Sequence, residues 1–150
     1  MPLWFFVRHA PSIAAVRIVV LAVGRMRTPF DAASAHYLKM LGRHARVEVV
    51  ELREDESVER RIPPRAHVTL LDVEGRALGS EQLATWLEER RHAGRDLCFV
   101  VGGPFGVELS RCDQKLSLGP MTLPHLLARV VLLEQLFRAH KIIAGEPYHH

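Results

Sequence analysis

Two segments rich in glycine and proline have the residue types and spacing of a ligand-binding site. Segment 102–106 (Gly-Gly-Pro-Phe-Gly) ends an apolar run, and its paired glycines allow a ligand to approach the backbone because no Cβ is in the way. Segment 116–125 is apolar and is interrupted by Gly119, Pro120 and Pro124. The prolines stiffen this loop, so its backbone N–H and C=O groups are held in place for an adenine-like edge. Loops beyond the carboxyl ends of strands are where α/β sheets bind ligands, so a pocket is predicted here.

Three further candidates lie on the helical pattern over 124–143. His125 stands beside helix N-terminal N–H groups, which disfavour its charged form, so a neutral ring is predicted; a capping or packing role and a catalytic role both stay open. Arg129 and Arg138 are nine residues apart, which places them about 180° apart around a helix. They cannot serve one point together. Exposure to solvent is the default expectation for both; one could hold a partner chain or the core while the other faces substrate.

Several other chemistries are excluded by spacing. The chain lacks the G-x-x-x-x-G-K-[ST] phosphate loop and the full G-x-G-x-x-G fingerprint, so triphosphate and dinucleotide sites are not expected. Its histidines and cysteines have no metal-type spacing, so no metal site is predicted. Asp31, Glu51 and Asp72 form no evident carboxylate pair. Taken alone, segment 102–106 is better explained as an ordinary tight turn without a ligand, because short Gly-rich turns are common.

The elements that must position these residues alternate between strands and helices. Continuous apolar runs of strand length suit strands buried on both faces, and helical spacing of apolar residues suits amphipathic helices. The pattern predicts an α/β fold, a single domain with a parallel sheet. The charged segment 53–64 is expected to be a loop or a short frayed helix. The expected strands are 17–23, 47–52, 68–72 and 97–101, and the expected helices are 29–41, 81–92 capped by Ser80, and 124–143.

Composition is that of an ordinary globular domain. The chain has 150 residues, 48% hydrophobic and 25% charged, with a net charge of +3, a mild basic bias compatible with RNA. Cys98 lies in an apolar strand and is expected to be a buried free thiol, which fits a reducing cytoplasm. Residues 1–16 are too short to span a membrane and lack the pattern of a signal peptide. They are expected to be an N-terminal extension, with an added strand or a packing arm as the alternative.

With these residues in view, the chain resembles the ribosomal RNA large subunit methyltransferase H family, a small member of the SPOUT class of knotted methyltransferases. The likeness runs from about Arg17 to the C-terminus, so 17–150 is expected to be the SPOUT domain. A long, ordered set of motifs is far more specific than a lone Gly-rich turn. The matching segments are Leu71-Asp72-Val-Glu-Gly75, Val101-Gly102-Gly103-Pro104-x-Gly106, Leu116-Ser117-Leu118-x-x-Met121-Thr122-Leu123-Pro124-His125, Arg129-Val130, Glu134-Gln135-x-Phe137-Arg138-Ala139 and Pro147-Tyr148-His149.

The resemblance implies an S-adenosylmethionine-dependent enzyme with a C-terminal trefoil knot. It implies methylation of N3 of a pseudouridine in 23S rRNA of the assembled ribosome, by a cytoplasmic homodimer with no role for DNA or a membrane. Apolar residues on more than one face of helix 124–143 also suit a dimer contact, and a charge at Leu133 or Leu136 is expected to split the dimer or to unfold the chain. Catalytic roles are implied for Arg138, Tyr148 and His149. Cofactor binding is implied for Leu71, Gly102, Leu118, Gly119, Pro120, Met121, Thr122 and Leu123.

Two other functions stay open from the sequence. One is a non-catalytic RNA-binding or ribosome-assembly module of the same fold, and the other is a small-molecule α/β enzyme that uses the same pocket. Segment 52–67 is also shorter than the helical stretch usual in the family, which leaves the RNA contacts of that edge open but does not touch the cofactor motifs.

Overall fold

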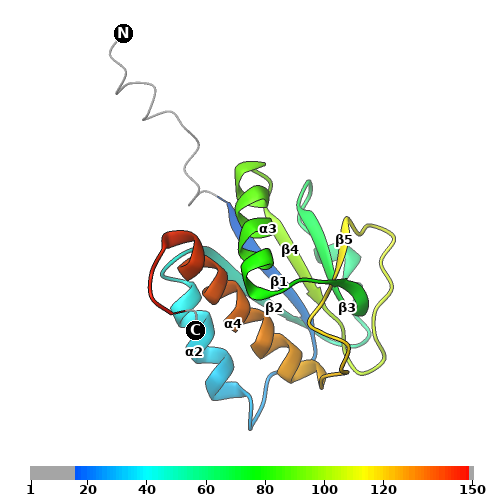
Figure 1. Ribbon diagram of the computed structural model, residues 1–150. Coiled ribbons are helices and arrows are strands. Elements are labelled where there is room, and N and C mark those ends of the chain that lie inside the picture. The colour runs from blue at the N-terminus through cyan, green and yellow to red at the C-terminus, as the bar shows by residue number, and fades with distance from the viewer. Residues whose placement is uncertain (1–15, 149–150) are drawn as a thin grey trace.

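All five strands run parallel in one sheet, in the order β2-β1-β4-β3-β5. The computed structural model describes residues 16–148. Within these residues three helices accompany the sheet (Figure 1), which confirms the predicted α/β fold. The elements are β1 (Arg17–Val23), α2 (Asp31–Leu41), β2 (Arg46–Leu52), the 3-10 turn η2 (Glu59–Arg61), β3 (His67–Ala77), α3 (Ser80–His92), β4 (Leu97–Val101), β5 (Gln114–Ser117) and α4 (His125–Ala144).

Both faces of the central strands are buried, which explains their continuous apolar runs. Alternate residues of β1 face opposite sides: Ile18 and Val20 belong to the core under the helices, whereas Val19 and Leu21 belong to the core on the other face. Helix α4 packs between α2 and α3 over the first face (Figure 1). The second face is covered by segment 53–66 with η2 and by segment 107–112.

The expectation for Cys98 is confirmed, whereas the expectation for the N-terminal extension is tested only at its last residue. Cys98 is a buried free thiol, as predicted, and burial raises its pKa to about 11. Val16, the last residue of the predicted extension, is buried in the core under the helices. Residues 1–15 lie outside the described part of the chain, so that expectation stays a prediction. Within the described part, none of the helices is long and apolar enough to cross a bilayer.

The predicted starts of the helices α2 and α3 are wrong. Helix α2 begins at Asp31, two residues after Pro29. The N-cap of α3 is Gly79, not Ser80, and its N–H donates to Oε1 of Gln82 at 2.8 Å. The hydroxyl of Ser80 instead donates to Oε1 of Gln135 on α4 at 2.6 Å, so it serves the contact between the helices.

The third and fifth strands depart furthest from expectation. Residues 114–117 form β5 where the sequence predicted an irregular loop, and β3 continues to Ala77 in order to pair with it. Leu71 and Arg76 both pair with Leu116, so residues 72–75 leave the ladder as a bulge. A Cβ at Gly75 would lie 2.7 Å from the backbone carbon of Lys115. Only glycine therefore allows this close approach.

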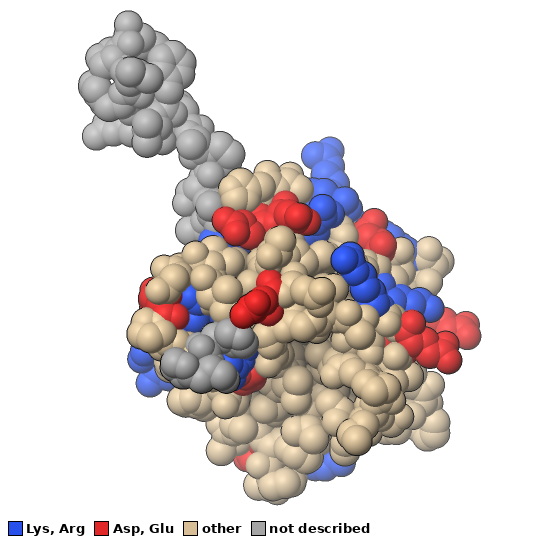
Figure 2. Space-filling model, in the orientation of Figure 1, with Lys and Arg blue, Asp and Glu red and all other residues tan. Residues whose placement is uncertain are grey.

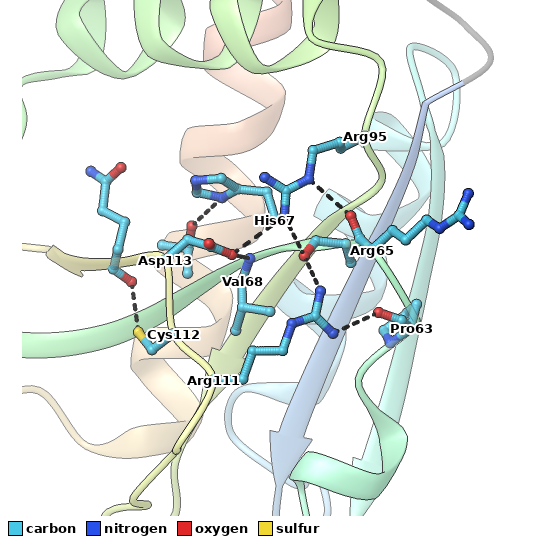
Figure 3. A network of polar contacts seen from close by, with 11 residues as sticks. Pro63, Arg65, His67, Val68, Arg95, Arg111, Cys112 and Asp113 are labelled. Carbon is cyan, nitrogen blue, oxygen red and sulfur yellow. Dashed lines mark hydrogen bonds and ion pairs between the residues drawn. The ribbon is translucent and has the colours of Figure 1, made fainter.

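Hydrogen bonds from arginine side chains link the segments at the amino end of the sheet (Figure 3). Arg95 and Arg111 both donate to the carbonyl oxygen of Ala66, at 3.1 and 2.6 Å. The carboxylate of Asp113 accepts from the N–H of Val68 at 2.8 Å. These bonds tie together three loops that would otherwise leave carbonyl groups unpaired. The opposite, carboxyl end of the sheet is where the cavity described next is located.

Candidate functional site

A cavity of about 650 Å³ lies at the carboxyl ends of β3, β4 and β5 and reaches the first turn of α4. This volume falls in the range of small-ligand and cofactor sites. Its lining is mostly apolar. The lining residues are Leu71, Asp72, Val73, Gly103, Pro104, Gly106, Leu118, Gly119, Met121, Thr122, Leu123, Pro124, His125 and Ala128.

Six of the eight predicted cofactor residues line this cavity: Leu71, Leu118, Gly119, Met121, Thr122 and Leu123. Gly102 and Pro120 are not among its lining residues. A Cβ at Gly102 would lie 3.2 to 3.3 Å from backbone atoms of Gly106, so the missing side chain lets turn 102–106 close on itself. The N–H of Gly106 donates to the carbonyl of Gly103 at 3.0 Å across that turn. Gly102 therefore acts indirectly, by allowing the turn that contributes Gly103, Pro104 and Gly106 to the cavity wall.

Sequence reasoning did not assign the cavity residues Asp72, Val73 and Ala128. The signal for the first two was present, because they belong to the motif over 71–75. What places them in the wall is the bulge of β3. Ala128 is brought there by the first helical turn, in which its N–H donates to the carbonyl of Pro124 at 2.9 Å.

Loop 118–124 offers backbone groups to a ligand. The hydroxyl of Ser117 donates to the carbonyl of Gly119 at 2.9 Å and accepts from its N–H at 3.1 Å, which fixes the start of the loop. Among the described residues, the N–H groups of Met121, Thr122 and Leu123 make no hydrogen bond. The Met121 side chain is 80% exposed at the rim. Apolar walls with unpaired backbone groups fit an adenine-like ring, which needs both stacking surface and hydrogen-bonding partners.

Arg129 lies in the core beneath the cavity. The default expectation of solvent exposure is wrong for this residue, and the alternative, that one of the two arginines holds the core, is confirmed. The Arg129 side chain is 2% exposed and donates to Oε2 of Glu51 at 2.6 Å and to the carbonyl of Gly24 at 2.8 Å. The same Oε2 accepts from the N–H of Met26 at 2.6 Å. Arg129 thus joins α4, the end of β2 and the segment after β1. Glu51 carried no signal in the sequence beyond its place near the end of a strand.

Charge around this support is set by burial and by pairing. Burial would raise the pKa of Glu51, but hydrogen bonds from Arg129 and Met26 lower it below its ordinary value, so the carboxylate is charged. Burial lowers the pKa of His125, and the charges of Arg129 and Arg27 lower it further. The ring is neutral at pH 7, as predicted. The N-cap of α4 is Pro124, so His125 does not cap the helix.

The described part of the tail folds back on the second half of α4. The ring of Tyr148 packs edge-on against Phe137, with 4.8 Å between centroids, and the guanidinium of Arg138 lies 4.8 Å from the centre of the Tyr148 ring. Arg138 also pairs with Glu134 at 2.7 Å, and the Tyr148 hydroxyl lies 3.4 Å from the same carboxylate. Burial and the charge of Glu134 raise the pKa of Tyr148. His149 lies outside the described residues.

The structure therefore places the predicted residues in two groups within one chain. His125 borders the cavity, and Arg138 lies thirteen residues further along the same helix. At 1.5 Å per residue this separation is about 20 Å. Arg138 and Tyr148 are brought together, but not beside the cavity. The two arginines are also kept apart, as their spacing predicted, with Arg129 holding the core.

Comparison with known proteins finds relatives over most of the chain. The family model described as "Predicted SPOUT methyltransferase" matches residues 16–149. Three relatives carry the name ribosomal RNA large subunit methyltransferase H. The protein from Solidesulfovibrio magneticus is 46% identical, covering 87% of this chain and 97% of its own length. That from Rubrobacter xylanophilus is 45% identical, covering 89% and 98%. That from Nitratidesulfovibrio vulgaris is 40% identical, covering 87% and 96%.

The residues matched by the family model include the cavity lining and all of α4. The parallel α/β sheet is the architecture expected for the matched family. The chain belongs to the SPOUT methyltransferase family, in the group of the large subunit methyltransferase H proteins.

Proposed function

We propose that this protein is an S-adenosylmethionine-dependent methyltransferase that methylates N3 of a pseudouridine in 23S rRNA of the assembled ribosome, in the cytoplasm. The observation that carries the proposal is the cavity, which is walled by turn 103–106 and loop 118–124. Its relatives' names support ribosomal RNA of the large subunit as the substrate. The net charge of +3 is compatible with an RNA substrate.

The residues present fit the proposed cofactor. Leu71, Leu118 and Leu123 supply apolar surface for the adenine, and the unpaired backbone groups of residues 121–123 supply partners for its edge. Gly102 and Pro120 complete the proposed site by holding the turn and the loop in shape. When bound, the cofactor supplies an activated methyl group to a nucleophilic ring nitrogen.

The proposed catalytic group is Arg138, Tyr148 and His149. N3 of pseudouridine is only weakly acidic, so its methylation needs a group that takes the proton and a positive charge nearby. Arg138 supplies the charge. The raised pKa of Tyr148 keeps its phenol protonated at neutral pH, so it suits the role of a hydrogen-bond donor that orients the base. We therefore assign to His149 the role of the base that takes the proton from N3.

A homodimer is part of the proposal, because the cavity and the Arg138–Tyr148 pair lie about 20 Å apart along α4 of one chain. A second copy related by two-fold symmetry can bring its tail to the first copy's cavity. Leu127, Val131 and Ile142 are partly exposed apolar residues of α4 on the side of Glu134 and Arg138. Figure 2 shows a broad surface without Lys, Arg, Asp or Glu in the centre and lower part of this view, with charged side chains along the upper, left-hand and right-hand edges.

Two measurements test the function. Calorimetry with S-adenosylmethionine is expected to give saturable binding, and tritium transfer from the labelled cofactor is expected on ribosomes that lack this methyl group. Absence of cofactor binding by the folded protein would reject the methyltransferase. Ribosome binding without methyl transfer would instead support the non-catalytic RNA-binding module, and cofactor binding with transfer only to small molecules would support the small-molecule enzyme.

A further inference from the structure

The segment that follows β1, residues 24–28, lies next to the cavity wall at His125. A Cβ placed on Gly24 would lie 3.2 Å from Nε2 of His125, and His125 lines the cavity. The segment therefore begins in direct contact with the cavity wall. Neither its sequence nor the cofactor motifs gave it a role.

This segment is held firmly. Arg129 donates to the carbonyl of Gly24 at 2.8 Å, and the N–H of Met26 donates to Glu51 at 2.6 Å. Because Glu51 is itself paired with buried Arg129, both anchors lead into the core of the domain. Residues 25 and 27, on either side of the anchored Met26, are thereby presented in a fixed place.

Arg25 and Arg27 are both exposed, and within residues 16–148 neither forms an ion pair. Other exposed arginines of this part of the chain, such as Arg46 and Arg65, also lack an ion pair, so what distinguishes Arg25 and Arg27 is their place on the anchored segment beside the cavity. The charge of Arg25 helps to lower the pKa of Glu51, but neither Arg25 nor Arg27 has a carboxylate within 4.0 Å among the described residues. Exposed guanidinium groups on an anchored segment beside a cavity suit an external anion.

We propose that Arg25 and Arg27 bind the phosphate backbone of the RNA substrate beside the cavity. The inference rests on the proposed function and deepens it by assigning the surface that receives the RNA. The Cα atoms of the two arginines lie at most about 7 Å apart, so their side chains can reach separate phosphate groups. Phosphate contacts of this kind fix the register of a nucleic acid and give affinity that depends on salt.

The test uses the full-length protein with both arginines changed, R25A/R27A. The matched control is R46A/R65A, which removes two exposed arginines at the amino end of the sheet, opposite the cavity (Figures 1 and 3). Four quantities are measured: KM for ribosomes, kcat at saturating ribosomes, the Kd for S-adenosylmethionine, and ribosome affinity by co-sedimentation at several salt concentrations.

The proposal expects KM and the co-sedimentation Kd to rise at least tenfold in R25A/R27A, with kcat within about twofold and cofactor affinity unchanged. The slope of log affinity against log salt is expected to fall by about 2, one for each lost cation. The R25K/R27K variant keeps both charges and is expected to recover most of the affinity. The control variant is expected to match the wild type.

Other results overturn the inference. Weaker cofactor binding would assign the arginines to the carboxylate of S-adenosylmethionine, and a fall in kcat alone would assign them to the reacting atoms. An equal loss in the control variant would reduce the effect to general basicity. Thermal unfolding checks that the variants are folded. If R25A/R27A does not fold, R25E/R27K takes its place, because it keeps two long side chains but removes their net charge. Loss of ribosome affinity in R25E/R27K, with normal affinity in R25K/R27K, would then support the proposal, and unchanged affinity in R25E/R27K would overturn it. A wild type that sediments with ribosomes but transfers no methyl group rejects the function alone.

Discussion

Arg129 and Glu51, 78 residues apart in the sequence, form a 2.6 Å ion pair that joins α4 to the end of β2. One partner is almost fully buried, and both are bonded to the segment after β1. The pair therefore connects three elements around the candidate cavity. Its strength decides how rigidly His125 and residues 24–28 are held.

Replacing Arg129 by Met is expected to destabilise the protein by about 3 kcal/mol, because Glu51 and the carbonyl of Gly24 lose their shared donor. Chemical denaturation measures the change. Arg46→Met is the matched control, since it removes an exposed arginine, and a change within about 0.5 kcal/mol is expected. Equal stability of the two variants would mean that the pair is not a structural link.

Gly75→Ala is expected to cost about 1–3 kcal/mol of stability and to weaken cofactor binding, since its Cβ would meet the backbone of Lys115 and push the bulge of β3 into the cavity wall. Denaturation and calorimetry give the two values. At Gly79 the nearest atom to a Cβ is Oε1 of Gln82 at 3.6 Å, an ordinary contact, so Gly79→Ala is the control. Unaltered cofactor binding in Gly75→Ala would remove the bulge from the site.

Truncation before Pro147 is expected to leave cofactor binding nearly intact and to lower methyl transfer by about 10²–10⁴-fold, the usual contribution of a general base. The cavity residues all precede the cut, and Tyr148 contacts Phe137 and Arg138 rather than the cavity. Tritium transfer to ribosomes measures the rate. Tyr148→Phe and His149→Ala separate the two side chains. Wild-type rates in the truncated protein would move the catalytic assignment to Arg138 and His125.

A glutamate is expected to have different effects at buried Leu133 and at partly exposed Leu127 of α4. Leu133 and Leu136 are 0% exposed in the core of one chain, so of the two effects expected for a charge there, splitting of a dimer or unfolding, the structure favours unfolding. Leu133→Glu is expected to unfold the protein, because burying an unpaired charge costs several kcal/mol. Leu127→Glu, at a partly exposed position, is expected to give a folded monomer. Sedimentation and circular dichroism distinguish the two, and a wild type that is monomeric at micromolar concentration would reject the dimer.

His140 is expected to make stability depend on pH. Burial lowers its pKa from 6.5 to about 4, assisted by the charges of Arg91 and His44 and opposed by its hydrogen bond to the carbonyl of Leu136. The folded state thus favours the neutral ring. Its contribution is complete above pH 6.5 and is lost as the pH falls from 6.5 to 4, by about 3 kcal/mol in all.

Denaturation at pH 7 and at pH 4.5 measures this loss in the wild type and in His140→Leu. The variant lacks the titrating group, so its unfolding free energy is expected to fall less over the same interval. Parallel curves for the two proteins would show that other groups, such as His67, carry the pH dependence.

The sequence by itself determined the parallel α/β sheet and most of the cavity lining. Strands buried on both faces leave continuous apolar runs, so β1 and β4 were predicted with their observed bounds. Glycine and proline restrict the backbone locally, which made loop 116–125 and turn 102–106 legible as a pocket, whereas Leu71 was assigned only through the resemblance to the family.

Tertiary structure alone decided the strand β5, the bulge of β3 and the burial of Arg129. A short strand such as 114–117 has too few residues for a periodic pattern, and it exists because β3 offers it a partner. An arginine has the same chemistry in solvent and in a core, and only the position of Glu51 makes its burial favourable. Contacts between residues far apart in the chain depend on how the elements pack, which local sequence does not encode.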